Sequence, residues 1–315
     1  MCRGGGRAYR RSMMSQQAAE PDGSGTAGTV TTAVFGDVAR WGDRPAVLDL
    51  DGGEHIGYAR LAEMVRRAAG GLLRRGLRPG DVVGMDVIPS PECVAAAYAV
   101  LSAGGVVTPV GGDPAADAAH LSAHDSRLLL AAPRRADAAI ALADRSRVRQ
   151  VIALGEATGA TSFASLLDDD GPSPALPPSP ESPALLPVGA SAAYDHRAVL
   201  DRMRRLSRVI APTDLDVVLI SGPPGDGTAL LTVLSLALRR GATVLTAASM
   251  DLDRARRVLT DQRVRLALLH APVVRGLSAL PLDRSLPSLA AVISPVPPLI
   301  ATPAHPAAAP ADAIV

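Results

Sequence analysis

The feature that most constrains the fold of this 315-residue chain is an alternation of strand-like and helix-like segments, which begins at Thr31. Short runs rich in Val, Ile and Leu indicate strands, and segments of helical length separate them. Parallel strands need such crossovers to return to the same edge of a sheet. The alternation therefore predicts an α/β fold with two mostly parallel βαβ lobes. The predicted strands are Val82–Ile88, Val106–Val110, runs starting at Arg127 and Val148, Val217–Ile220, Thr243–Ala247, Leu266–His270 and Leu289–Ile293.

The helical segments supply these crossovers. Apolar residues recur at spacings of three and four in two arginine-rich segments, 58–76 and 197–210, so each helix should bury one face and expose most of its arginines. The expected buried residues are Leu61, Met64, Ala68, Leu72, Val199, Leu200, Met203 and Leu206. Another helix should begin with Ser90 as its N-cap and Pro91 at its first position.

Shifts in composition predict the domain organisation. The N-terminal residues are rich in Gly, Ser, Gln and Arg and offer little to pack, so they are expected to be disordered. A later stretch holds seven prolines in 20 residues, a density that favours a linker. The expected parts are a leader (1–30), a first α/β lobe (31–167), a proline-rich linker (168–187), a partial second lobe (188–299) and a Pro/Ala-rich tail (300–315).

Charge and composition exclude several classes of function. The net charge of +1 gives no electrostatic case for binding nucleic acid or an anionic membrane. All 32 basic residues are arginines, so chemistry that needs a lysine amine is closed to this chain. Two cysteines, Cys2 and Cys93, exclude a disulfide framework and a Cys-rich zinc site. The longest apolar run, Ala229–Leu238, is about half the length that spans a bilayer, so a soluble cytoplasmic protein is expected.

Two ordered blocks carry a family resemblance, "DVARWGDRPAVLDLDG" and "IGYARLAEMVRRAAGGLLRRGLRPGDVVGMDVIPSPECVAAAYAVLSAGGVVTPV". They resemble the N-terminal region of the adenylate-forming enzymes, which include acyl-CoA synthetases, luciferases and nonribosomal adenylation domains. Two later segments, "VRLALLHAPVVRGLSAL" and "LPSLAAVISPVPPL", are also similar to this family. The resemblance covers about Val34 to Leu299. It implies the family's N-terminal domain fold and ATP-dependent activation of a carboxylate to an acyl-adenylate, followed by transfer to a thiol such as that of CoA.

The resemblance also locates the family's phosphate-binding loop, which is rich in Ser, Thr and Gly and ends in Pro-Lys-Gly. Backbone N–H groups, hydroxyls and the lysine of such a loop hold the β- and γ-phosphates. The matching interval here, "LPVGASAAYDHRAVL", spans Leu186 to Leu200 and lacks both the lysine and the threonines. The candidate nucleotide-binding residues that remain are Gly189, Ser191 and His196. For His196, an ordinary surface histidine at a helix start is the favoured alternative.

Other parts of the family pattern are missing as well. Its aromatic-His pair would align with Pro223 and Pro224, and its pocket-lining glycine segment with Ser294–Pro297. The sequence ends before the family's Tyr-Gly-x-Thr-Glu segment, its ribose-binding Asp and its lysine-bearing C-terminal domain. Each lost donor in a phosphoryl-type site costs about 3 kcal/mol. These departures predict a truncated, degenerate homologue with no catalytic residue and no cofactor of its own. It would keep an acyl or nucleotide crevice, or act beside a partner synthetase.

Two alternatives remain. The first is an active carboxylate–CoA ligase that a separate polypeptide completes, with ATP, Mg²⁺, CoA and an acyl or aryl carboxylate as its ligands. The second is a nucleotide-binding module built on Gly222–Gly227, which has the spacing of a Walker phosphate loop. Thr228 follows directly where that motif needs lysine, so a plain strand-to-helix turn at the mouth of the acyl pocket is the favoured interpretation.

No metal site is expected. His120 and His124 have the i, i+4 spacing that suits a metal on a helix, but no third ligand is evident. The neighbouring Asp117 and Asp125 more simply indicate a solvated face. His270 ends an apolar strand, which favours a buried histidine with satisfied hydrogen bonds over a ligand. The run Asp168–Asp170 is expected to be solvated charge in the linker.

Overall fold

The computed structural model describes residues 28–86, 89–168, 178–222, 225, 227–281, 285–295, 298–302 and 305–310. Several segments named above therefore lie outside the described residues. They are 1–27 of the expected leader, Val87 and Ile88, 169–177 of the expected linker, Pro223 and Pro224, Val296 and Pro297, and 311–315 of the expected tail.

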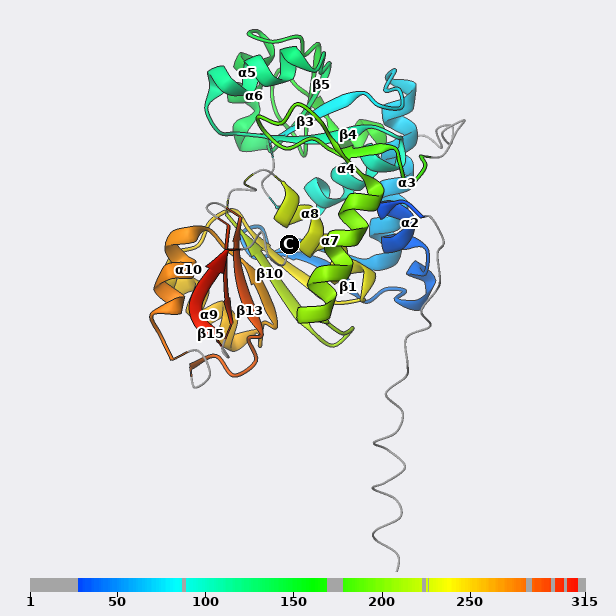
Figure 1. Ribbon diagram of the computed structural model, residues 1–315. Helices are drawn as coiled ribbons and strands as arrows, with labels where there is room; N and C mark the ends of the chain where they lie inside the picture. The colour runs from blue at the N-terminus through cyan, green and yellow to red at the C-terminus, as the bar shows by residue number, and fades with distance from the viewer. Residues whose placement is uncertain are drawn as a thin grey trace, which may run out of the picture.

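Among the described residues, the strands form two mostly parallel sheets (Figure 1), which confirms the predicted fold class. The seven-stranded sheet has the order β7-β6-β5-β3-β4-β8-β9, and only β9 runs antiparallel to its neighbour. The eight-stranded sheet has the order β15-β14-β13-β12-β10-β11-β1-β2, with antiparallel pairing at its two ends. The seven-stranded sheet contains β3 (Val82–Asp86), β4 (Val106–Val110), β5 (Leu128–Ala131), β6 (Gln150–Ala153), β7 (Thr161–Ser162), β8 (Pro183–Leu185) and β9 (Tyr194–Asp195). The eight-stranded sheet contains β1 (Pro45–Asp49), β2 (His55–Gly57), β10 (Val217–Ser221), β11 (Thr243–Ala247), β12 (Leu266–Leu268), β13 (Ala291–Pro295), β14 (Pro298–Thr302) and β15 (His305–Pro310).

The helices begin where the sequence provides caps. Ser90 accepts a hydrogen bond from the backbone N–H of Cys93, and Pro91 is the first residue of α4, as predicted. The predicted apolar faces of α3 and α7 are buried. The described helices are α2 (Val30–Phe35), α3 (Tyr58–Arg74), α4 (Pro91–Ser102), α5 (Pro114–Ala123), α6 (Ala136–Ala143), α7 (His196–Val209), α8 (Thr228–Arg239), α9 (Leu252–Asp261) and α10 (Ala271–Ser278). Short 3₁₀ helices are η1 (Val38–Arg40), η2 (Pro133–Arg135) and η3 (Phe163–Leu166).

Sheets and helices stack in five layers (Figure 1). Successive side chains of a strand point to opposite faces, and on β10 this places Val218 and Ile220 in a central core and Leu219 in an outer one. The central core lies between the two sheets and holds the buried faces of α3, α4, α7 and α8. Helices α9 and α10 cover the outer face of the eight-stranded sheet, and α5 and α6 cover that of the other. One continuous core thus joins both sheets.

The two sheets do not coincide with the expected lobes of residues 31–167 and 188–299. Strands β1 and β2 precede β3 in the chain, yet β1 pairs with β11, where Val47 lies opposite Val244. Strands β8 and β9 in turn close one edge of the seven-stranded sheet. Each sheet therefore includes a segment from the other side of the proposed linker. Such pairing depends on contacts between distant residues, which local periodicity does not encode.

Two proline-rich segments form strands where none was expected. Pro183 is the first residue of β8, a position that needs no ladder donor, and the next two residues are buried beside β4. The expected tail contains most of β14 and all of β15, which pair with each other. The linker expectation is therefore wrong for Pro183–Leu185, and the tail carries sheet structure up to Pro310.

Candidate functional site

An apolar pocket lies between the two sheets, where the faces of α4 and α8 meet. About 550 Å³ of unoccupied space lies in the pocket and the open solvent at its mouth. None of its described lining residues is charged, and Thr246 is the one that carries a side-chain hydroxyl. Helix α4 contributes Cys93, Val94 and Ala97, and α8 contributes Leu230, Leu231 and Leu234. An environment of this kind takes up a hydrocarbon or aromatic group and excludes ions.

Gly227, the last residue of the Gly222–Gly227 segment, lines this pocket. The backbone φ angle of Gly227 is +84°, a left-handed conformation that favours glycine. A Cβ atom on Gly227 would lie 3.0 Å from Pro109 Cγ and 3.2 Å from Leu185 Cδ1. The start of α8 therefore packs against strands of the other sheet and leaves no room for a phosphate at Gly227. This geometry supports the turn interpretation over a phosphate loop.

His270 lies next to this turn and is half-buried. A Cβ atom on Gly222 would lie 3.2 Å from His270 Cβ, and the left-handed φ of Gly222 (+103°) also favours glycine. His270 is the N-cap residue of α10, but its side chain does not cap that helix. The expectation of a buried histidine therefore holds only in part, because His270 lies beyond the end of β12 and is half-buried.

The three candidate nucleotide-binding residues do not form one cradle. Gly189 and Ser191 are exposed in the loop between β8 and β9, and a Cβ atom on Gly189 would meet nothing within 4 Å. His196 is fully buried at the start of α7, so the expectation of a surface histidine is wrong. Gly189 and Ser191 thus lie in an exposed loop, whereas the imidazole of His196 is buried.

The buried imidazole of His196 holds helix α2 in place. The backbone N–H of Val30 donates a 3.2 Å hydrogen bond to His196 Nδ1, so the ring proton must sit on Nε2. Nε2 has no hydrogen-bond partner among the described residues. Burial lowers the pKa of His196 to about 4, although the nearby Asp195 carboxylate acts in the opposite direction. His196 is therefore neutral at physiological pH.

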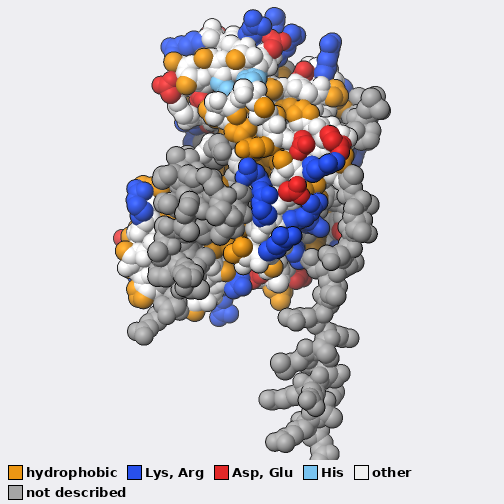
Figure 2. All heavy atoms as spheres, viewed as in Figure 1, with side chains coloured by type: hydrophobic (Ala, Val, Ile, Leu, Met, Phe, Trp, Pro, Cys, Tyr) orange, Lys and Arg blue, Asp and Glu red, His pale blue; other side chains and the backbone are white. Residues whose placement is uncertain are grey.

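The described residues do not fit the triphosphate that the fold family implies. The segment Val188–Asp195 offers one glycine, one serine and no cation. The guanidinium groups nearest to it in the chain are already engaged, because Arg197 pairs with Glu181 and Arg202 lies 4.7 Å from the ring centre of Tyr194. Arginines on this face gather over α7 rather than on the loop (Figure 2). A polyanion at the loop would find no dedicated charge partner in these residues.

His120 and His124 are close together but do not make a metal site. Their ring centres lie 4.9 Å apart, and no group of three potential ligands exists among the described residues. Thr108 Oγ1 donates to the Leu186 carbonyl at 2.8 Å, so His120 Nε2, 2.9 Å away, must donate to Thr108. This arrangement ties α5 to the centre of the sheet. Burial and the neighbouring His124 lower the pKa of His120.

The two aspartates beside these histidines differ from each other. Asp125 is exposed, as expected. Asp117 is buried, and its Oδ2 accepts hydrogen bonds from the backbone N–H groups of Gly111 and Gly112 at 2.9 and 3.1 Å. The expectation of a solvated face is therefore wrong for Asp117, because the β4–α5 turn folds over its carboxylate.

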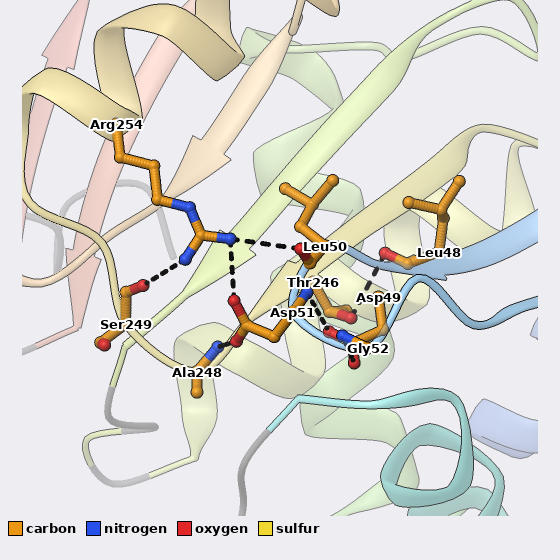
Figure 3. A network of polar contacts seen from close by, with 9 residues as sticks. All are labelled: Leu48, Asp49, Leu50, Asp51, Gly52, Thr246, Ala248, Ser249 and Arg254. Carbon is orange, nitrogen blue, oxygen red and sulfur yellow. Dashed lines mark hydrogen bonds and ion pairs between the residues drawn. The ribbon is translucent and has the colours of Figure 1, made fainter.

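A second, polar cleft of about 900 Å³ separates the two sheets at another point. One wall is the β1–β2 turn, which a polar network holds against α9 (Figure 3). Arg254 NH2 donates to Asp51 Oδ1 at 2.8 Å, and the Ala248 N–H donates to Asp51 Oδ2 at 2.8 Å. Partial burial alone would raise the pKa of Asp51, but these two hydrogen bonds hold that pKa below its usual value. On the opposite wall, burial raises the pKa of Glu92.

The pocket-lining residues were not identified as a site from the sequence. On α8, Gly227, Leu230, Leu231 and Leu234 have the spacing i, i+3, i+4 and i+7, which marks one helical face. That periodicity was visible in the sequence, but it indicates burial of any kind. Only the distance between the sheets turns this face into a pocket wall.

No described helix is both long enough and apolar enough to cross a membrane.

Comparisons with known proteins agree with this architecture. A model of the AMP-binding enzyme family matches residues 34–309. Salicyl-AMP ligase / salicyl-S-ArCP synthetase of Mycobacterium tuberculosis is 34% identical over 172 residues, which cover 51% of this chain and 30% of that protein. Triostin synthetase I of Streptomyces triostinicus is 32% identical over 156 residues, covering 48% and 29% of the two chains. The chain therefore spans less than a third of the length of these curated relatives.

Solved structures show the same fold. The apo structure of Mycobacterium smegmatis MbtA superposes with a TM-score of 0.72 and 22% identity, over 93% of this chain and 60% of that one. The family match extends over most of the sequence, and the two sheets are arranged as in this solved structure. On this evidence, the chain belongs to the AMP-binding enzyme family.

Proposed function

We propose that this chain binds an aryl or acyl carboxylic acid in the apolar pocket and does not form the acyl-adenylate by itself. The observation that carries the proposal is the contrast between two neighbouring parts of the site. The pocket between α4 and α8 is apolar, whereas Val188–Asp195 has no cation and an open glycine. The chain is therefore suited to bind the carboxylic acid and poorly suited to bind the triphosphate of ATP.

The relatives support the substrate class. One of them is a salicyl-AMP ligase by name, which points to an aromatic carboxylic acid. A salicylate-sized ring or a short acyl chain would lie between Cys93 and Leu234, with its carboxylate directed toward the pocket mouth at Gly227. Burial of apolar surface contributes about 25 cal/mol per Å² to binding. A cytoplasmic location and a partner synthetase subunit remain predictions.

Two measurements on the purified chain test the proposal. Calorimetric titration with salicylate, benzoate and octanoate should detect saturable 1:1 binding of at least one acid. Titration at several temperatures should give a negative heat-capacity change, because apolar surface is buried on binding. Carboxylate-dependent ATP–pyrophosphate exchange should stay at background. Exchange above background would contradict the non-catalytic part, and failure of every acid to bind would contradict the binding part.

A second candidate function is an active carboxylate–CoA ligase that a separate polypeptide completes. The observation that favours it is the continuous core that joins both sheets around the pocket, which would give an incoming domain a formed surface. ATP, Mg²⁺ and CoA would then be held largely by residues of the other polypeptide. Exchange that appears only when the product of an adjacent reading frame is added would support this candidate over the first.

A further inference from the structure

Four arginines line a surface hollow of the seven-stranded sheet. It lies at the end of the sheet where the strands begin, away from the apolar pocket. The hollow follows the amino-terminal ends of β3, β5 and β6, and the lining arginines are Arg75, Arg127, Arg147 and Arg149. It consists of two adjoining parts of about 730 and 720 Å³ that share Asp125, Arg127 and Arg149. In sheets of this kind, substrates bind at the carboxyl ends of the strands. The hollow is therefore separate from the proposed substrate site.

Most of these guanidinium groups are held in place from one side. Asp125 bridges two of them, with Oδ2 3.0 Å from Arg127 NH2 and Oδ1 3.2 Å from Arg147 NH1. Arg75 NH2 donates to Ser165 Oγ at 2.8 Å. Each of these contacts uses one nitrogen of the guanidinium group. The remaining N–H groups of these arginines are thus available to a ligand, and the side chains that carry them are already held in position.

Arg149 is the fourth arginine of the hollow, and its side chain makes none of these contacts. It is exposed and lines both parts of the hollow, its backbone N–H donates to the Arg127 carbonyl at 2.9 Å, and its guanidinium has no hydrogen-bond or ion-pair partner among the described residues. The acidic groups of the hollow are Asp81 and Asp125, so arginines outnumber acids by four to two. An arginine placed without a partner among three others raises the local positive potential, which a bound anion would relieve.

The carboxyl ends of nearby helices provide a competing explanation for the cluster of arginines. Helices α3, α5 and α6 end at this edge, and cations near the carboxyl end of a helix offset its dipole. That effect would stabilise the fold without any ligand. The two explanations differ in what they predict, because a dipole partner changes stability and a ligand site changes binding. The test must therefore measure binding directly.

We propose that this hollow binds a small ligand that carries two or more phosphate groups. Planar guanidinium forks match phosphate oxygens bidentately, and four of them on separate segments suit several linked phosphates better than a single anion. A concave lining suits a small molecule better than a flat macromolecular surface. The net charge of +1 also gives no reason to expect a nucleic acid.

The probe is sodium tripolyphosphate, which has no base or acyl group that the proposed substrate site could bind. Calorimetric titration of the full chain should show 1:1 binding that weakens as NaCl is added. Arg149→Gln and Arg127→Gln should each weaken binding about tenfold, the effect of losing one charge-assisted hydrogen bond. The Arg149 guanidinium has no partner among the described residues and the backbone hydrogen bond to Arg127 survives its replacement, so Arg149→Gln should leave the fold intact, and matched melting temperatures would check this.

Two control variants locate the site. Arg205→Gln removes an exposed arginine on α7, and Ser191→Ala alters the phosphate-loop remnant. Both should leave tripolyphosphate affinity unchanged. The proposal is overturned if tripolyphosphate does not bind, if Ser191→Ala or Arg205→Gln weakens binding as much as Arg149→Gln, or if citrate binds more tightly than tripolyphosphate. Altered melting temperatures with unaltered binding would assign the arginines to the helix termini instead.

Discussion

The backbone N–H of Val30 donates a hydrogen bond to the Nδ1 atom of His196, 166 residues later in the chain. This contact fixes α2 across the start of α7, and it can form only while Nδ1 is unprotonated. The imidazole is fully buried, and its other nitrogen has no partner among the described residues. Protonation would therefore break one hydrogen bond and leave a buried charge without compensation.

We expect His196 to make the protein less stable in mild acid. Its pKa is about 4 in the folded chain and about 6.5 in the unfolded chain, so the unfolded state binds more protons between these values. The stability supplied by neutral His196 is complete above pH 6.5 and is lost progressively as the pH falls to 4, by about 3 kcal/mol in total. Urea denaturation at intervals of half a pH unit would measure this loss.

The matched variant is His196→Gln, whose side-chain oxygen can still accept from Val30 but does not titrate. Its free energy of unfolding should fall much less between pH 6.5 and pH 4 than that of the wild type. His120 titrates in both proteins and therefore cancels in the comparison. If both proteins lose the same free energy over this range, the loss does not come from His196.

Gly227→Ala should destabilise the protein through two separable effects. An alanine in the left-handed conformation costs about 1–2 kcal/mol, and its Cβ would also press on Pro109 and Leu185. Gly189→Ala is the matched control, because Gly189 has a similar φ of +76° and open space around its Cβ. Chemical denaturation should show a larger loss for Gly227→Ala, by about 1 kcal/mol or more. Equal losses would mean that the contact with the other sheet relaxes without cost.

Much of the local structure could be predicted from the sequence. The predicted strands at 106–110 and 243–247 have the same bounds as β4 and β11, because an apolar run between turn residues carries its own signal. The assignment of β1 to the eight-stranded sheet could not be predicted, since it depends on pairing with β11, almost 200 residues away. His196 was misjudged for the same reason, because α2 covers it and is remote in the chain.

The site could be predicted only in part. The missing lysine and threonines of the phosphate loop were visible as letters, and the structure adds that Gly189 is open to solvent. Asp117 looked like a surface charge because no pattern shows that a turn will wrap its carboxylate. The resemblance predicted an acyl crevice, but its lining residues were not predicted, since they depend on how closely α4 and α8 approach each other.

A hydrogen bond in the central core joins α4 to α8, and its removal should be costly. Tyr98 Oη and Ser235 Oγ lie 2.8 Å apart, and both residues are fully buried, on α4 and α8. Tyr98→Phe should lower the free energy of unfolding by about 1–3 kcal/mol, because Ser235 would lose its partner in a dry environment. In a double-mutant cycle, Tyr98→Phe with Ser235→Ala should cost less than the sum of the single changes. Additive losses would show that the two hydroxyls are not coupled.

Cys93 offers a direct test of the pocket, because its side chain lines the space between α4 and α8 and forms no disulfide. Cys93→Phe should fill part of that space and weaken binding of a carboxylic acid about tenfold or more, whereas Cys93→Ala should retain it. Overpacking costs about 1–3 kcal/mol, so melting temperatures must confirm that the phenylalanine variant is folded. In the wild type, bound acid should also slow alkylation of Cys93 by iodoacetamide, followed by peptide mass spectrometry with Cys2 as the internal reference. Binding that survives Cys93→Phe, with unprotected Cys93, would place the acid elsewhere.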